Sequence, residues 1–94
     1  MEIKHIKLSG KGAFIVKEEG KRLAEMTYVD AGEGAFIIDH TFVDESLRGQ
    51  KVGDKLVAAA VEYARENKLK IYATCPFALK VLTRTTEYHD VFQP

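Results

Sequence analysis

The most informative part of the 94-residue sequence is residues 35–67, which read AFIIDHTFVDESLRGQKVGDKLVAAAVEYAREN. Residues 35–43 combine β-branched and aromatic side chains on both alternating faces, which predicts a central strand that is covered on both sides. The alternation puts Phe36, Ile38, His40 and Phe42 on one face and Ala35, Ile37, Asp39, Thr41 and Val43 on the other. From residue 51 the apolar side chains recur every three or four positions, which predicts an amphipathic helix over residues 51–67.

The flanking segments extend this strand–helix unit in both directions. Residues 12–16 and 23–29 read as strands separated by polar, glycine-containing turns, which predicts an antiparallel meander. Residues 70–74 predict a further strand, and Pro76 ends it because proline has no N–H. Its pairing with residues 36–43 is expected to be parallel, through a right-handed crossover. A short helix is expected over residues 77–83. Its predicted inward side chains are Phe77, Val81 and Leu82.

These elements predict one α/β (α+β) domain over residues 1–94, with a mixed, mostly antiparallel sheet. The elements follow one another along the chain in the order β-β-β-α-β-α. The sequence is 46% hydrophobic, and 14 Lys and Arg balance 14 Asp and Glu. This balance argues against broad binding to nucleic acid or to acidic membranes. The longest apolar run has six residues, and the N-terminus has no hydrophobic signal region. With Cys75 as the single cysteine, these features predict a cytoplasmic protein. An exposed sheet edge is compatible with a monomer or a weak homodimer.

The connection between the long strand and the helix, residues 44–53, is the candidate binding segment. A polar turn that opens a helix exposes unpaired backbone N–H groups, which attract phosphate or pyrophosphate. Gly49 and Gly53 permit close approach of a ligand. Positive charge comes from Arg48, Lys51 and Lys55. The spacing matches neither a P-loop nor a dinucleotide-binding turn, and an ordinary connection with solvated charges is the alternative.

Residues 48–53, Arg-Gly-Gln-Lys-Val-Gly, resemble the acyl-CoA pyrophosphate loop of GCN5-related N-acetyltransferases, Gln/Arg-x-x-Gly-x-Gly/Ala. Arg48 and Gly53 match this pattern, whereas Lys51 stands where glycine is usual. We expect a right-handed helical backbone at Lys51, which accepts a lysine. With His-Thr-x-Val at residues 40–43 and Cys-Pro-Phe at residues 75–77, the chain resembles the very small, single-domain branch of that family.

This resemblance implies two parallel strands that splay apart at their C-terminal ends and hold acetyl-CoA between them. It implies that Phe42 and Val43 offer backbone groups to the pantetheine arm and that the thioester lies near Cys75. The pyrophosphate would be cradled by the N–H groups of Gln50, Lys51, Val52 and Gly53, next to Gly49. The charges of Arg48, Lys51 or Lys55 would meet the other phosphates, and Phe77 would contact CoA from the second helix.

The implied activity is acetyl transfer from acetyl-CoA, as co-substrate, to an amine of unknown identity. An alternative is a non-catalytic acyl-CoA-binding module that acts through a partner protein; the short chain and Lys51 favour it. A third is a structural domain whose loop binds nothing.

Two side chains are candidates for catalysis. Cys75 ends a strand and precedes a helix, so its pKa is expected to fall. It is interpreted as a nucleophile, as a lining group of the thioester pocket, or as a small buried hydrophobe. His40 is interpreted as a general base, which would pair with Cys75, or as a core histidine bonded to a carbonyl. His5 and His89 lie in no ligand cluster, so no metal is expected.

Overall fold

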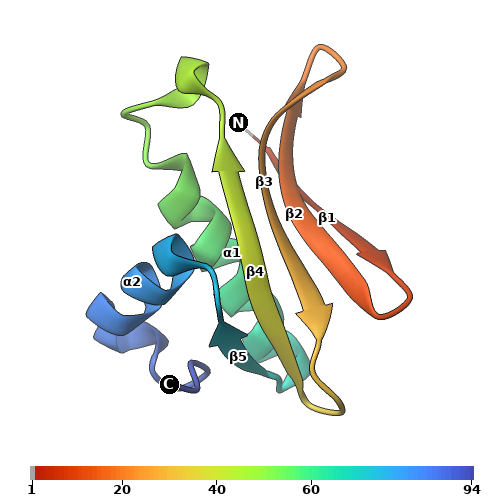
Figure 1. Ribbon diagram of the computed structural model, residues 1–94, viewed down its shortest axis with the longest axis vertical. Coiled ribbons are helices and arrows are strands. Elements are labelled where there is room, and N and C mark those ends of the chain that lie inside the picture. The colour runs from red at the N-terminus through yellow and green to blue at the C-terminus, as the bar shows by residue number, and fades with distance from the viewer. Residues whose placement is uncertain (1) are drawn as a thin grey trace.

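A five-stranded sheet and two helices make up the structure, a computed structural model that describes residues 2–94 (Figure 1). The sheet has the strand order β1-β2-β3-β4-β5, antiparallel throughout except for the parallel pair β4–β5. The strands are β1 (Ile3–Leu8), β2 (Lys11–Glu18), β3 (Lys21–Asp30), β4 (Ala35–Val43) and β5 (Lys70–Ala73). The helices are α1 (Val52–Asn67) and α2 (Pro76–Arg84), with short 3-10 turns η1 (Glu45–Leu47) and η2 (Thr86–Tyr88). The predicted mixed, mostly antiparallel fold is confirmed.

Strand β1 was not among the predicted elements. It pairs antiparallel with β2 at the edge of the sheet, where His5 lies opposite Phe14 and Ile6 lies opposite Ala13. Its pattern is the reverse of the usual one, because the polar His5 faces the helix layer while Ile6 and Leu8 are exposed. Alternation of apolar and polar residues therefore gives a misleading signal at this edge.

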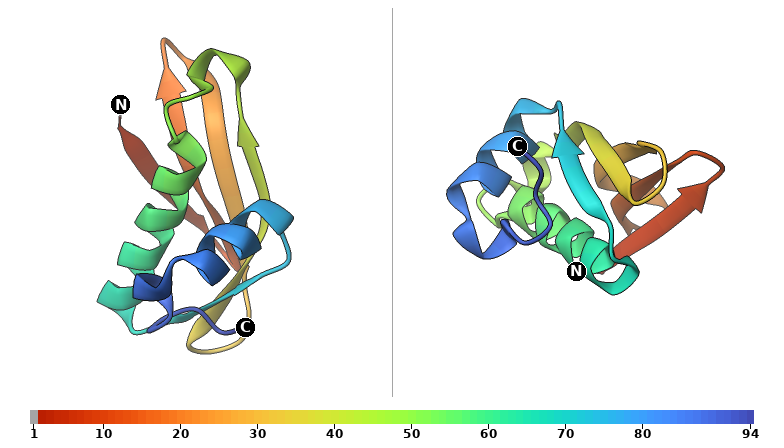
Figure 2. Two further views of the ribbon diagram at one scale, coloured as in Figure 1. Left: turned by 90° about the vertical axis from the view of Figure 1, so that its left-hand side faces the viewer. Right: turned by 90° about the horizontal axis from the view of Figure 1, so that it is seen from below.

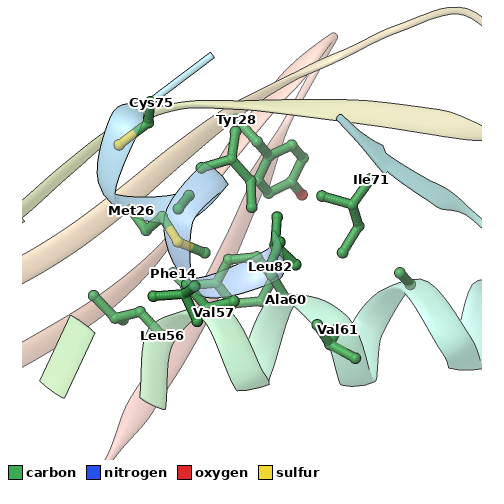
Figure 3. Close-up of a cluster of buried hydrophobic side chains, with 14 of the residues drawn as sticks. Phe14, Met26, Tyr28, Leu56, Val57, Ala60, Val61, Ile71, Cys75 and Leu82 are labelled. Atoms are coloured by element: carbon green, nitrogen blue, oxygen red, sulfur yellow. The ribbon is translucent and has the colours of Figure 1, made fainter. Parts of the chain in front are cut away.

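Both helices cover the same face of the sheet, as the two side views show (Figure 2). The core lies between them and the sheet, where Met26 and Tyr28 of β3 meet Leu56 and Val57 of α1 (Figure 3). No element of residues 2–94 covers the opposite face of the sheet, so the prediction that β4 is covered on both sides is wrong. We call this opposite surface, which carries Phe42, the outer face.

Strand β4 contains a β-bulge at Asp39. Thr27 of β3 pairs with His40 and the next β3 residue, Tyr28, pairs with Ile38, so Asp39 is the extra residue on β4. The Thr27 hydroxyl donates to Asp39 Oδ1 over 2.6 Å, which holds the extra residue on the outer face. A bulge of this kind shifts the alternation of side chains by one position.

The bulge corrects the predicted faces of the second half of β4. Thr41 lies opposite the buried Met26, and Val43 packs against the core, so both face the helices. His40 and Phe42 point to the outer face, where Phe42 is 44% exposed. The predicted grouping of His40 with Ile38 and Phe36 is wrong for this reason.

The pairing of β4 with β5 ends half-way along β4. Their pairing ends at Ile38 and Ala73, and the amides of Thr74 and Cys75 both donate to the Ile38 carbonyl, over 2.9 and 3.3 Å. Beyond this point residues 39–43 of β4 continue without a β5 partner, and Figure 1 shows β4 extending past the end of β5. The expected splay of the parallel pair is present.

The C-terminal segment docks against the edge of β5 that faces away from β4. Val91 and Phe92 are buried, and Ile71 of β5 exchanges backbone hydrogen bonds with this segment through the Val91 carbonyl and the Gln93 amide. Helix α2 buries Ala78, Val81 and Leu82, whereas Phe77 is 38% exposed, so its predicted inward orientation is wrong. Within residues 2–94, neither helix is long and apolar enough to cross a membrane.

Candidate functional site

A cavity of about 370 Å³ opens beside the unpaired half of β4. Its walls are built by β4, by the β4–α1 connection and by the first turns of both helices. They include Thr41, Val43, Arg48, Gly49, Lys51, Val52, Gly53 and Phe77. The cavity therefore lies where the strands separate and where two helices begin, and it contains most of the residues predicted to bind CoA.

The first turn of α1 presents unpaired amides to this cavity. The α1 hydrogen-bond ladder begins with the Lys55 amide, which donates to the Lys51 carbonyl over 3.1 Å. No side chain of residues 2–94 caps this helix end. The amides of Val52, Gly53 and Asp54 precede the ladder and point out of the helix, toward any anion that occupies the cavity.

Lys51 has a left-handed backbone, with φ 55° and ψ 38°. The right-handed conformation expected there is wrong. A left-handed conformation costs an L-residue about 1–2 kcal/mol, which is a physical reason for glycine to be usual at this position. Gly49, at φ 85°, supplies a second positive φ in the same connection. Together these two residues turn the chain from β4 into α1.

Gly53 has a packing role that the sequence does not reveal. A β-carbon built on Gly53 would lie 2.6 Å from Cζ and 2.7 Å from Cε2 of the Phe77 ring. The ring therefore rests directly on the α1 backbone and joins the two helix N-termini at the cavity wall. The absence of a side chain at Gly53 serves this contact as well as any approach by a ligand.

The charged groups around the connection leave the helix end electropositive. Asp54, in the first turn of α1, receives a hydrogen bond of 2.6 Å from Arg84 of α2, which offsets its negative charge. Arg48 lies 3.6 Å from Glu45, with both side chains largely exposed. The Asp44 carboxylate accepts from the Ser46 amide over 3.0 Å, and this hydrogen bond lowers the pKa of Asp44. Lys51 and Lys55 form no ion pair with the described residues.

The unpaired edge of β4 carries backbone groups at alternate residues. The Asp44 amide donates to the Leu23 carbonyl over 2.7 Å, so this residue faces β3. Because backbone groups alternate along a strand, Phe42 also faces β3, while Thr41 and Val43 direct their N–H and C=O groups to the open side. The expected role for the Phe42 backbone is thus inconsistent with the strand geometry, whereas Val43 fits it.

Cys75 and His40 do not form the predicted pair. Cys75 precedes α2, is 7% exposed and donates from Sγ to Thr41 Oγ1 over 3.4 Å. His40 lies on the outer face and is separated from Cys75 by the sheet itself. The strict alternation of side chains predicts His40 on the face that carries the cavity, but the bulge puts Thr41 on that face instead. Thr41 lines the cavity, with the Cys75 thiol against it.

Comparisons with known proteins place this chain in a family. A sequence model of the GCN5-related N-acetyltransferases matches residues 13–91. The chain belongs to the GCN5-related N-acetyltransferase family. A solved structure of a GCN5-like candidate N-acetyltransferase from Staphylococcus aureus is 43% identical, with a TM-score of 0.75 over 98% of this chain and 87% of that one. Comparison with curated protein sequences gives no match.

More distant acetyltransferase structures share the fold. A ribosomal-protein-alanine N-acetyltransferase from Brucella melitensis is 18% identical, with a TM-score of 0.66. An aminoglycoside acetyltransferase from an uncultured soil metagenomic sample has the same identity and TM-score. The matches cover 83% and 84% of this chain but only 64% and 60% of those two chains. This GCN5-related chain therefore shares the architecture of a part of each of those two chains.

Sequence reasoning missed three features of the site. Thr41 was assigned to the wrong face because the bulge at Asp39 leaves no glycine or proline signal in the sequence. The contact between Gly53 and Phe77 joins two helices that are distant in sequence. The ion pair between Arg84 and Asp54 likewise depends on how α2 packs on α1.

Proposed function

We propose that this GCN5-related chain is an acyl-CoA-dependent N-acetyltransferase that binds the CoA pyrophosphate on the first-turn amides of α1. The observation that carries the proposal is the uncapped N-terminus of α1, which opens into a cavity next to the unpaired half of β4. Lys51, Val52 and Gly53 would surround the pyrophosphate, and Gly49 shapes the approach to it. The Gln50 amide, which was expected to join them, already donates to the Leu47 carbonyl over 3.3 Å. Helix N-termini of this kind favour phosphate groups through both their N–H groups and their dipole.

The remaining cavity groups fit the rest of acetyl-CoA. The Val43 and Thr41 backbones are available to pair with the pantetheine amides, as a strand would. The exposed cations Arg48 and Lys51 of the cavity wall, and Lys55 outside it, would meet the other phosphates, and Phe77 would cover the arm between the two helices. The acetyl group would then reach the deep part of the splay, near Thr41 and Cys75.

The reaction is the direct transfer of an acetyl group to an amine. The amine nitrogen attacks the thioester carbon, a C–N bond forms, the C–S bond breaks, and CoA leaves as a thiolate. The amine loses one proton and the thiolate gains one, so no oxidant or reductant is needed. The burial of Cys75 behind Thr41 favours this direct route over an acetyl-cysteine intermediate.

Charge reversal at the two ends of α1 tests the binding half of the proposal. Lys51 and Lys68 both have left-handed backbones and both flank α1, at its start and at its end. We expect Lys51→Glu to weaken acetyl-CoA binding at least about 10-fold, because it sets a carboxylate beside the diphosphate. Lys68→Glu makes the same change of net charge at the far end and should leave affinity unchanged. Calorimetric titration measures both; equal effects, or no saturable binding to the native chain, would contradict the proposal.

Turnover distinguishes the enzyme from a binding module. The native chain is incubated with acetyl-CoA and a panel of amines, and release of free CoA thiol is followed. His40→Ala is the control, because His40 lies on the outer face, and this variant should release CoA at the native rate. Saturable binding without CoA release for any amine would support the non-catalytic acyl-CoA-binding module instead.

A further inference from the structure

The hydroxyl group of Thr41 occupies a position between the cavity and the core. It lies on the cavity wall, beyond the β4 bulge, and its Oγ1 accepts a hydrogen bond of 3.4 Å from the Cys75 thiol. The other polar side chains on that wall, those of Asp44, Arg48, Lys51 and Asp54, are all charged. Among the cavity-lining side chains of residues 2–94, Thr41 is therefore the uncharged polar one.

The hydrogen bonds of Thr41 leave one donor available. A threonine hydroxyl has one O–H donor and two acceptor lone pairs. The Cys75 thiol uses a lone pair, and Thr41 Oγ1 donates to no acceptor within residues 2–94. The thiol thus restricts the rotation of the hydroxyl and leaves its hydrogen for a group in the cavity. The cationic groups that would attract an anion lie at the connection and not at Thr41. The acceptor that suits the Thr41 hydroxyl is therefore a neutral one.

The strand geometry indicates which part of a ligand would reach Thr41. Val43 lies next to the connection, and Thr41 is two residues further from it, which is about 7 Å along a strand. A ligand held by its diphosphate at α1 and extended along the open edge of β4 would bring its distal end to Thr41. In acyl-CoA that end is the thioester, whose carbonyl oxygen is a neutral acceptor.

We propose that the Thr41 hydroxyl donates a hydrogen bond to the thioester carbonyl oxygen of bound acyl-CoA, with Cys75 as the positioning residue that fixes the hydroxyl. This inference rests on the proposed function of the cavity and adds a recognition element for the acyl group. It assigns Thr41 to substrate binding and explains why the bulge directs a threonine, and not His40, into the splay.

Two ligands that differ in the carbonyl test the proposal. Acetyl-CoA and S-ethyl-CoA have nearly the same size, but S-ethyl-CoA is a thioether without a carbonyl oxygen. The native chain should bind acetyl-CoA about 2- to 10-fold more tightly than S-ethyl-CoA, the range expected for one neutral hydrogen bond. Thr41→Val should bring this ratio to about one while leaving the affinity for S-ethyl-CoA unchanged. Thr41→Ser should retain the preference, and Cys75→Ala should reduce it.

The outcomes separate this inference from the function on which it rests. The same acetyl-CoA preference in the native chain and in Thr41→Val would overturn the role of Thr41 while leaving the CoA site intact. Failure of both ligands to bind the native chain would overturn the site and the inference together. If Thr41→Val does not fold, Thr41→Ala serves as the second hydroxyl-free variant, with the same expected loss of preference.

Discussion

Lys51 and Lys68 are the two residues with left-handed backbones that flank α1, and each is a lysine where glycine would be unstrained. Replacing either by glycine removes a conformational penalty, although glycine also gains entropy in the unfolded chain. We expect Lys51→Gly and Lys68→Gly each to raise the free energy of unfolding by about 0.5–1 kcal/mol. Urea denaturation measures this. Lys55→Gly, inside the first turn of α1, is the matched control and should lower stability by about 1 kcal/mol.

At the residue scale, the sequence singled out the connection that lines the cavity but not its backbone conformation. Arg48 and Gly53 match a known pattern, and the structure places both at the cavity. The sign of φ at Lys51 has no signature in the sequence, because glycine is the usual marker of a left-handed position. The same holds for His40 and Thr41, whose faces depend on a bulge that neither residue type reveals.

At the scale of elements, the contact between α1 and α2 depends on one glycine. A methyl group at residue 53 would displace the Phe77 ring, although alanine is a better helix former than glycine. We therefore expect Gly53→Ala to destabilise the native chain but to stabilise a Phe77→Ala chain by up to about 1 kcal/mol. A double-mutant cycle of unfolding free energies should give a coupling of about 1 kcal/mol or more. Additive effects would contradict the packing role of Gly53.

The elements themselves were predictable to different degrees. Helix α1 was predicted to within one residue, since its buried residues follow a regular helical period. The edge strand β1 was missed, because its central inward residue, His5, is polar, while the apolar Ile6 and Leu8 are exposed. In helix α2, Val81 and Leu82 face inward as predicted, whereas Phe77 packs on α1 at the surface and not in the core.

At the scale of the whole molecule, His5 connects the edge strand to the rest of the fold. Its ring stacks on Phe14 at 4.3 Å and meets Tyr63 of α1 edge-on at 4.5 Å. Its Nε2 lies 2.6 Å from Tyr28 Oη. Burial raises the pKa of Tyr28, so the tyrosine stays protonated and can donate to a neutral His5. Burial and the neighbouring Lys7 lower the pKa of His5.

This shift predicts a loss of stability in mild acid. Below its unfolded pKa of 6.5, His5 binds a proton more readily in the unfolded chain than in the folded one. The stabilisation is therefore complete above pH 7 and declines as the pH falls through 6.5 toward the lowered pKa of the folded state. Unfolding free energies between pH 5 and 8 should show this decline, and His5→Gln should flatten it. His40→Gln, which leaves the His5 cluster intact, should keep the native decline.

Because β4 contains one extra residue, it cannot be compared position by position with a strand that lacks the bulge. Deleting Asp39 would remove the bulge and leave an unbroken odd–even order, with His40 and Phe42 still on the bare side and Thr41 and Val43 still toward the helices. Loss of this one codon would therefore keep both surfaces, whereas flattening the bulge with Asp39 retained would exchange them. A sequence alignment that misplaces one gap in this strand would assign the cavity wall to the wrong residues.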